Sequence, residues 1–151
     1  MTEEHVTKAV IAWLKGLQFE IIHFDYPGSG TGKPLHPNQE LRTNKNAGAI
    51  IPDIIAARGK ALTLFENKVW FSKGDIDNLL LLRNSGRYTE ALDRLLSAQQ
   101  EGCLPLIGIA LSKEDVNVTR LLAVKDEIDF AIVVNSSGIA EVVYAPDRLF
   151  A

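Results

Sequence analysis

Residues 50–70 read IIPDIIAARGKALTLFENKVW, a stretch in which two apolar runs are separated by a short polar turn. The runs predict two β-strands, at residues 49–57 and 61–69, because apolar residues dominate both and Gly59 suits the tight turn between them. The first half of the second run is almost continuously apolar, which is typical of a strand in the middle of a sheet. The stretch therefore predicts a β-hairpin at the centre of the fold.

Charged side chains interrupt this hairpin at Asp53 on the first strand and at Glu66 and Lys68 on the second. Alternate residues of a strand share a face, so Glu66 and Lys68 are expected to point the same way. With the turn at 58–60, Asp53 is expected to pair with residue 65 or 66. Two carboxylates and one ammonium can therefore converge at one face of the sheet.

Such a cluster suits a divalent cation. Charges removed from water are costly unless they are paired or bound to metal, and neighbouring carboxylates also repel each other. Mg²⁺ removes both penalties, because it prefers oxygen ligands and accepts phosphate oxygens of a substrate. A metal-bound water then becomes a nucleophile, which Lys68 can orient or help to deprotonate. We expect Mg²⁺, with Mn²⁺ able to substitute, whereas the alternative is an ordinary strand start at Asp53 and a solvated strand edge at Glu66 and Lys68.

The segments around the hairpin predict a mixed sheet flanked by helices. An apolar stripe with three- and four-residue spacing predicts a first helix, which Thr2 caps and which ends near Gly16. Further helices are expected at residues 74–83, 88–100 and 116–128, and further strands at residues 19–24, 104–111, 130–134 and 139–144. This order indicates an α/β (α+β) fold with a mixed central β-sheet.

A long segment, residues 26–48, precedes the hairpin and is rich in Gly, Pro, Asn and charge. Structureless loops of this length are uncommon in small domains and are often functional. It contains GSGTGK, but Pro27 and Pro34 do not fit a phosphate-binding loop, so no nucleotide cofactor is expected. The basic residues that could contact DNA, or could simply be solvated, are Lys33, His36, Arg42 and Lys45 in this loop and Lys73 after the hairpin.

Length and charge narrow the class of protein. The chain has 151 residues and a net charge of -3, which indicates one globular domain over residues 1–151. Because the balance is acidic, contacts with nucleic acid would have to be focused in a patch or assisted by metal. No apolar run reaches the roughly 18 residues that span a bilayer, no secretory signal is visible, and Cys103 is the only cysteine. We therefore expect a cytoplasmic protein with no membrane partner.

The order of helix, strand, hairpin and helix, with IIPD on one strand and FENK on the next, resembles the PD-(D/E)xK nuclease superfamily. The resemblance covers roughly residues 2–111 and implies the restriction-endonuclease-like fold. It implies that Asp53 and Glu66 bind metal and that Lys68 supports the attacking water. Many members add a Glu from the first helix, and Glu3 is favoured over Glu4 because it lies nearer the apolar stripe. Capping of the helix dipole is the alternative for both.

The resemblance implies a Mg²⁺-dependent endonuclease that acts on DNA, of the restriction, resolvase, repair or homing type. Because cutting both strands of a duplex needs two active sites, we expect a homodimer or higher oligomer, or pairing with a larger subunit. A non-catalytic nucleic-acid-binding or assembly module of the same fold is the alternative, which the acidic charge mildly favours. An enzyme acting on RNA is a third possibility, although no aromatic pair indicates RNA recognition.

Overall fold

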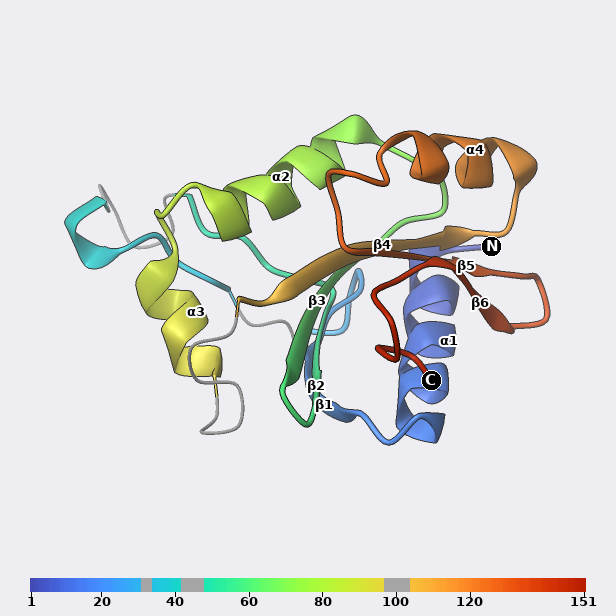
Figure 1. The fold of residues 1–151 in the computed structure, drawn as a ribbon, viewed down its shortest axis with the longest axis horizontal. Coiled ribbons are helices and arrows are strands. Elements are labelled where there is room, and N and C mark those ends of the chain that lie inside the picture. The colour runs from blue at the N-terminus through green and yellow to red at the C-terminus, as the bar shows by residue number, and fades with distance from the viewer. Residues whose placement is uncertain (31–33, 42–47, 97–103) are drawn as a thin grey trace.

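A six-stranded mixed β-sheet forms the centre of the computed structural model, which describes residues 1–30, 34–41, 48–96 and 104–151 (Figure 1). Its strands lie side by side in chain order: β1 (Glu20–Phe24), β2 (Ile54–Arg58), β3 (Ala61–Asn67), β4 (Leu106–Ser112), β5 (Phe130–Val134) and β6 (Ala140–Tyr144). The pairs β1–β2, β2–β3 and β5–β6 are antiparallel, whereas β3–β4 and β4–β5 are parallel. The predicted mixed α/β architecture is therefore confirmed.

Helices cover both faces of this sheet (Figure 1). In the described ranges there are four α-helices and one 3-10 helix: α1 (Glu3–Gly16), α2 (Lys73–Asn84), α3 (Thr89–Leu95), α4 (Asp115–Ala123) and η1 (Gln39–Leu41). Helix α1 lies on one face, and α2 and α4 lie on the other. Within these ranges, no helix combines the length and the apolar character needed to cross a membrane.

The core consists of two apolar clusters, one on each side of the sheet. Val10 and Leu14 of α1 pack with Phe65 of β3, whereas Leu79 of α2 packs with Leu64. Successive residues of β3 thus enter opposite clusters, as strand alternation requires. The pattern explains why the apolar run of this strand is continuous, since both of its faces are buried.

Several predicted boundaries differ from the structure for physical reasons. The strand expected at 49–57 begins only at Ile54, because Pro52 has no N–H to donate to a ladder and Ile50 instead bridges to Leu35. The helix expected at 116–128 ends at Ala123, where the chain turns so that Val124 and Ile128 both enter the core. Residues 97–100 of another expected helix lie outside the described residues.

The start of the first helix was predicted correctly. Thr2 is its N-cap, and the Thr2 Oγ1 atom accepts a hydrogen bond from the His5 main-chain N–H at 3.1 Å. Such a cap satisfies one of the N–H groups that the first turn of a helix leaves without a partner. Because the cap defines where α1 begins, Glu3 and Glu4 both lie in its first turn.

Arg58, the last residue of β2, holds the C-terminal segment against the sheet. Its guanidinium donates four hydrogen bonds, at 2.7 to 3.1 Å, to the carbonyl oxygens of Leu17, Arg148, Leu149 and Ala151. The guanidinium also lies 4.7 Å from the centroid of the Phe19 ring. One side chain thus joins the segment after α1, the end of β2 and the C-terminal residues.

We predict that Arg58→Lys lowers the free energy of unfolding by about 2–4 kcal/mol, because an ammonium cannot reproduce the planar fork and leaves carbonyl groups without a partner. Urea denaturation at neutral pH measures this difference. Lys60→Arg, at the exposed turn between β2 and β3, is the control and should change stability by less than about 0.5 kcal/mol. Equal stability of the Arg58→Lys variant and the native protein would contradict the role given to this side chain.

Candidate carboxylate site at the end of the sheet

Asp53 and Glu66 face each other across the β2–β3 hairpin. The β2–β3 register ends with the pair of Ile54 and Phe65, and Asp53 and Glu66 are the next residues on the two sides of the hairpin. The Asp53 N–H donates to the Phe65 carbonyl oxygen at 2.9 Å, which extends the ladder past the end of β2. Because Ile54 and Phe65 both face α1, their neighbours Asp53 and Glu66 both face the α2 side. The structure therefore brings these two predicted site residues together.

The two carboxyl groups hydrogen bond to each other in a half-buried position. Burial and the charge of Asp53 together raise the pKa of Glu66 to about 9, and burial is the larger cause. Burial also raises the pKa of Asp53 to about 6, although the hydrogen bond from the Asn67 N–H, 2.7 Å from Asp53 Oδ2, opposes this change. In the absence of a cation, the pair therefore shares a proton at neutral pH.

Lys68 completes the group of charges just beyond the end of β3. Its main-chain N–H donates to the Ala110 carbonyl oxygen at 3.0 Å, and its ammonium lies 3.2 Å from Glu3 Oε1. Burial lowers the pKa of Lys68, but the hydrogen bond with Glu3 and the charges of Glu3, Asp75 and Glu66 outweigh it and raise the pKa overall. Lys68 is therefore a cation at neutral pH, which suits a hydrogen-bond donor rather than a base.

Glu3 and Glu4 occupy different surroundings on α1. Glu3 contacts Lys68, whereas Glu4 lies 3.7 Å from Lys8 on an exposed part of the helix. The position of Glu3 depends on Asn67, which is fully buried and whose Nδ2 donates to Thr7 Oγ1 at 3.1 Å. Because Thr7 lies one turn after Glu3, this bond holds α1 against β3 where Glu3 can reach Lys68.

Asp75, in the first turn of α2, is a member of the group that the sequence analysis missed. Burial raises the pKa of Asp75, the charge of Lys68 lowers it, and that of Glu3 raises it. Asp75 in turn raises the pKa of Glu66 and of Lys68. The sequence shows an acidic residue in the first turn of the helix after the hairpin, but this position alone does not place α2 beside Lys68.

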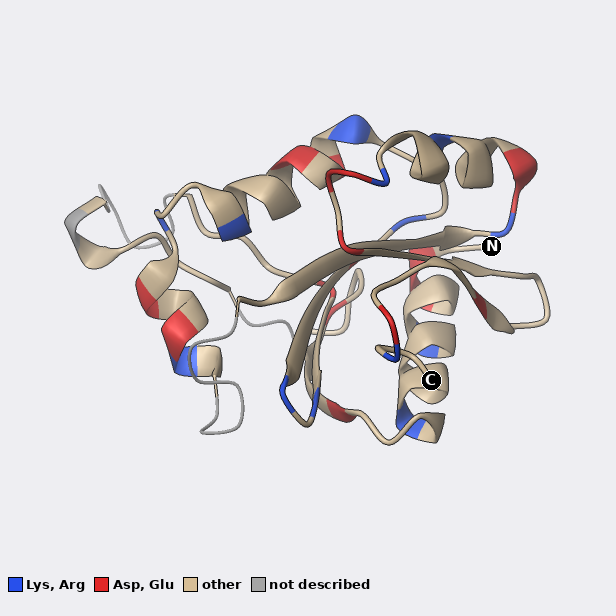
Figure 2. Ribbon diagram, in the orientation of Figure 1, with Lys and Arg blue, Asp and Glu red and all other residues tan. Residues whose placement is uncertain are grey.

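Of the basic residues predicted to contact DNA, the structure describes only His36 and Lys73. Lys33, Arg42 and Lys45 lie outside the described residues. Lys73 pairs with Glu127 at 2.5 Å and Asp77 at 3.3 Å, so binding a phosphate there would compete with two carboxylates. In the described parts of the chain, the Lys and Arg positions are spread along the ribbon over several elements (Figure 2).

The described middle of the long 26–48 segment is attached to the core. Leu35 is buried and pairs with Ile50, and the Asn38 main-chain N–H donates to the Arg87 carbonyl oxygen at 2.6 Å. The Asn38 side chain also hydrogen bonds with the start of α3. His36, between these anchors, has a buried Nδ1 atom that forms no hydrogen bond with any of the described residues. Residues 34–41 are therefore packed against the domain, unlike the structureless loop that the sequence suggested.

The carboxyl pair offers oxygen atoms of the kind that Mg²⁺ and Mn²⁺ prefer. Across the described ranges, no three or more His, Cys, Asp or Glu side chains form a group that could hold a metal ion. Mg²⁺ does not need such a group, because it commonly binds one or two carboxylates and completes its shell with water and substrate phosphates. The donor set formed by Asp53 and Glu66 therefore fits a divalent cation that is shared with a substrate.

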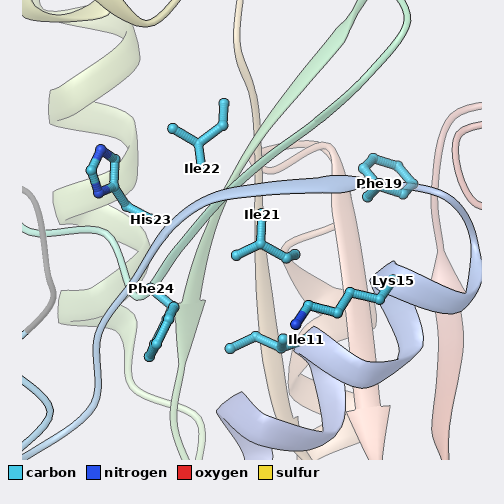
Figure 3. A pocket seen from close by; sticks show the side chains of 7 residues that line it. All are labelled: Ile11, Lys15, Phe19, Ile21, Ile22, His23 and Phe24. Carbon is cyan, nitrogen blue, oxygen red and sulfur yellow. The ribbon is translucent and has the colours of Figure 1, made fainter.

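A hollow lies between α1 and β1, on the α1 face of the sheet, whereas Asp53 and Glu66 face the α2 side (Figure 3). Apolar side chains dominate its lining, and the residues labelled in the figure are Ile11, Lys15, Phe19, Ile21, Ile22, His23 and Phe24. None of the predicted site residues lines it. This hollow is therefore separate from the hairpin end, where Asp53, Glu66 and Lys68 meet.

No protein-family model, curated protein or solved structure matches this chain. The resemblance to the PD-(D/E)xK superfamily therefore remains an expectation drawn from the motif residues of the sequence.

We predict that thermal stability falls as the pH rises from about 5 to about 9 in the presence of a chelator. The pKa of Glu66 is near 9 in the folded protein and ordinary, near 4.5, in the unfolded chain, so the folded state binds more protons throughout this window. The contribution of Glu66 to stability is therefore fully present below about pH 4.5 and is lost as the pH rises towards about 9. Thermal melts followed by circular dichroism at several pH values measure the slope.

Glu66→Gln cannot ionise and should flatten this dependence, whereas Glu20→Gln, at an exposed position in β1, should leave it unchanged. The difference between these two variants isolates Glu66 from the other titrating groups. If the native protein and the Glu66→Gln variant lose stability equally with pH, the shared proton between Asp53 and Glu66 is refuted.

Proposed function

We propose that the protein is a divalent-cation-dependent endonuclease that acts on DNA. The observation that carries this proposal is the half-buried carboxyl pair of Asp53 and Glu66 on adjacent strands, beside the ammonium of Lys68. Two carboxylates held this close repel each other unless a proton or a cation lies between them. The resemblance of the hairpin to the PD-(D/E)xK superfamily supports the choice of phosphodiester hydrolysis.

Asp53 and Glu66 would hold the cation, Mg²⁺ or Mn²⁺, which when bound supplies an activated water and stabilises charge at phosphorus. The Asn67 N–H orients the Asp53 carboxylate, and Asp53 orients Glu66. Lys68, which stays protonated, donates hydrogen bonds to the water or to a phosphate oxygen. Glu3 holds the Lys68 ammonium at the end of the sheet.

The charge balance of the site supports the proposal that this function needs a cation. Four carboxyl groups, those of Glu3, Asp53, Glu66 and Asp75, act on one ammonium, that of Lys68. A phosphate group approaching them without a cation would meet net repulsion. A divalent ion held by Asp53 and Glu66 would take the place of the shared proton, and its positive charge would favour binding of a phosphate group.

DNA is the proposed substrate, and a homodimer or higher oligomer is the proposed assembly for cutting both strands. The cytoplasm is the proposed compartment, in keeping with the single cysteine, Cys103. The acidic net charge of -3 favours a second candidate, a non-catalytic nucleic-acid-binding or assembly module of the same fold. A metal-dependent cleavage assay separates the two candidates.

We predict that the protein nicks supercoiled plasmid DNA in Mg²⁺ or Mn²⁺, and that Asp53→Asn and Lys68→Met each slow the reaction on the order of 100-fold or more, the loss typical for removal of an electrostatic stabiliser. The matched pair Glu3→Gln and Glu4→Gln compares two neighbouring residues of α1, of which only Glu3 contacts Lys68. Glu3→Gln should slow cleavage, and Glu4→Gln should not.

The outcomes of the cleavage assay are distinct. Cleavage that persists unchanged in Asp53→Asn and Lys68→Met assigns the activity to another site or to a contaminant. DNA binding without any cleavage by the native protein favours the non-catalytic module. Faster cleavage of single-stranded RNA than of duplex DNA would indicate that RNA, not DNA, is the substrate.

A calorimetric prediction tests the cation site without cleavage. Because Glu66 is protonated at neutral pH, Mg²⁺ binding should release about one proton at pH 7. Titration of the protein with MgCl₂ in two buffers of different ionisation enthalpy measures this number. Glu66→Gln should weaken binding and abolish the release, and Glu4→Gln should leave both unchanged. Mg²⁺ binding to native protein without proton release would exclude the shared-proton description.

A further inference from the structure

An open cavity of about 380 Å³ adjoins the carboxyl pair on the α2 side of the sheet. Its lining comes from residues 48–51, which lead directly into Pro52 and Asp53, and from Glu66, Asn78, Leu81 and Tyr88. Glu66 therefore belongs both to the carboxyl pair and to the wall of this cavity. A ligand in the cavity would lie next to the proposed position of the scissile phosphate.

Two of the residues that line the cavity, Ile51 and Leu81, are apolar and exposed to solvent. The exposed fraction is 43% for Ile51 and 41% for Leu81, whereas Leu79 and Leu82, on the same helix as Leu81, are 1% exposed. Helix α2 thus buries one apolar side in the core and presents Leu81 to the cavity. Ile51 and Leu81 both line this cavity and are open to water, so both are available to a ligand that binds there.

The cavity lining also includes a polar residue and a hydrogen-bonded pair. Asn78 is exposed, and no hydrogen bond to a described residue engages its side-chain amide, which carries both donors and an acceptor. Tyr88 is buried, and its hydroxyl donates to the Gly48 carbonyl oxygen at 2.6 Å. This bond ties Gly48, which lines the cavity, to Tyr88 at the start of α3.

We propose that this cavity binds a single unpaired nucleobase of the DNA strand that is cut. The inference rests on the proposed nuclease function and names its substrate class. A nucleobase has two apolar faces and a hydrogen-bonding edge, which match the apolar side chains of Ile51 and Leu81 and the amide of Asn78 among the lining residues. The cavity volume of about 380 Å³ lies within the roughly 300–1,000 Å³ of small-ligand sites, which leaves room for one nucleobase.

The substrate that follows is DNA with an unpaired nucleotide at the cleavage position, such as a single strand, a flap or a bulge. A base in a regular duplex must first leave the stack, which costs a few kcal/mol, and this cost is smallest where the base is already unpaired. The cavity thereby selects structure over sequence, since any base has two apolar faces. Regular duplex DNA is the disfavoured substrate.

The test is a binding experiment that needs no cleavage. Duplexes carry one bulged 2-aminopurine, an abasic nucleotide at the same bulge, or no bulge, and fluorescence anisotropy reports affinity both in EDTA and in Ca²⁺. The native protein should bind the bulged base about tenfold more tightly than the abasic bulge, the scale of one stacked base. The emission of 2-aminopurine should also change on binding.

Two cavity variants, Leu81→Asn and Asn78→Leu, should each remove most of this tenfold preference. Leu122→Asn on α4 is the matched control, because Leu122 is also an exposed apolar helix residue, 49% exposed, and does not line the cavity. Thermal melts check that the variants remain folded. Equal affinity of the native protein for the base and the abasic bulge overturns the inference, as does equal behaviour of Leu81→Asn and Leu122→Asn.

The two proposals fail in different ways. Metal-dependent nicking without any preference for an unpaired base leaves the nuclease function standing and removes the base-binding cavity. If the protein never cuts DNA but prefers the bulged base, and Leu81→Asn abolishes that preference, the result supports base binding in the cavity and contradicts the nuclease function. Absence of DNA binding in both EDTA and Ca²⁺ overturns the inference.

Discussion

The close approach of two carboxyl groups constrains the whole end of this sheet. Asp53 and Glu66 lie on the same face because the β2–β3 register pairs Ile54 with Phe65, and so their contact follows from the hairpin itself. The contact is stable only with a proton or a cation between the groups, since two buried like charges repel. The surrounding groups act on this pair or on Lys68 beside it. The Asn67 N–H donates a hydrogen bond to Asp53, and the Lys68 ammonium interacts with acidic residues in the first turns of α1 and α2.

Helix α1 contributes to this site through packing that occurs on the other face of the sheet. The buried bond between Asn67 and Thr7 joins β3 to α1, and Glu3 lies one helical turn before Thr7. Three consecutive residues of β3 and its extension therefore have three tasks: Glu66 faces α2, Asn67 anchors α1, and Lys68 bridges to Glu3. A substitution in the α1 interface would consequently change the surroundings of Lys68 without touching the carboxyl pair.

Local patterns were sufficient to predict the order of the elements, the central hairpin and the convergence of Asp53 with Glu66. Strand alternation and a tight turn depend only on neighbours in the chain, which is why they can be read from residues 50–70. The remaining features depend on distant contacts. The partner of Lys73 is Glu127, and the bonds of Asn38 reach α3, so neither could be inferred from spacing. Asp75 was missed because only the fold brings α2 to Lys68.

The chain-order arrangement of the strands has a consequence for how the molecule assembles. Each strand finds its partner in the strand that precedes it, so the sheet can grow from the N-terminal side as the polypeptide leaves the ribosome. The pairing of Asp53 with Glu66 needs only the first three strands. Lys68, however, obtains its main-chain partner from Ala110, which belongs to β4. A nascent chain that ends before β4 thus carries both acidic groups while the lysine beside them still lacks its backbone anchor.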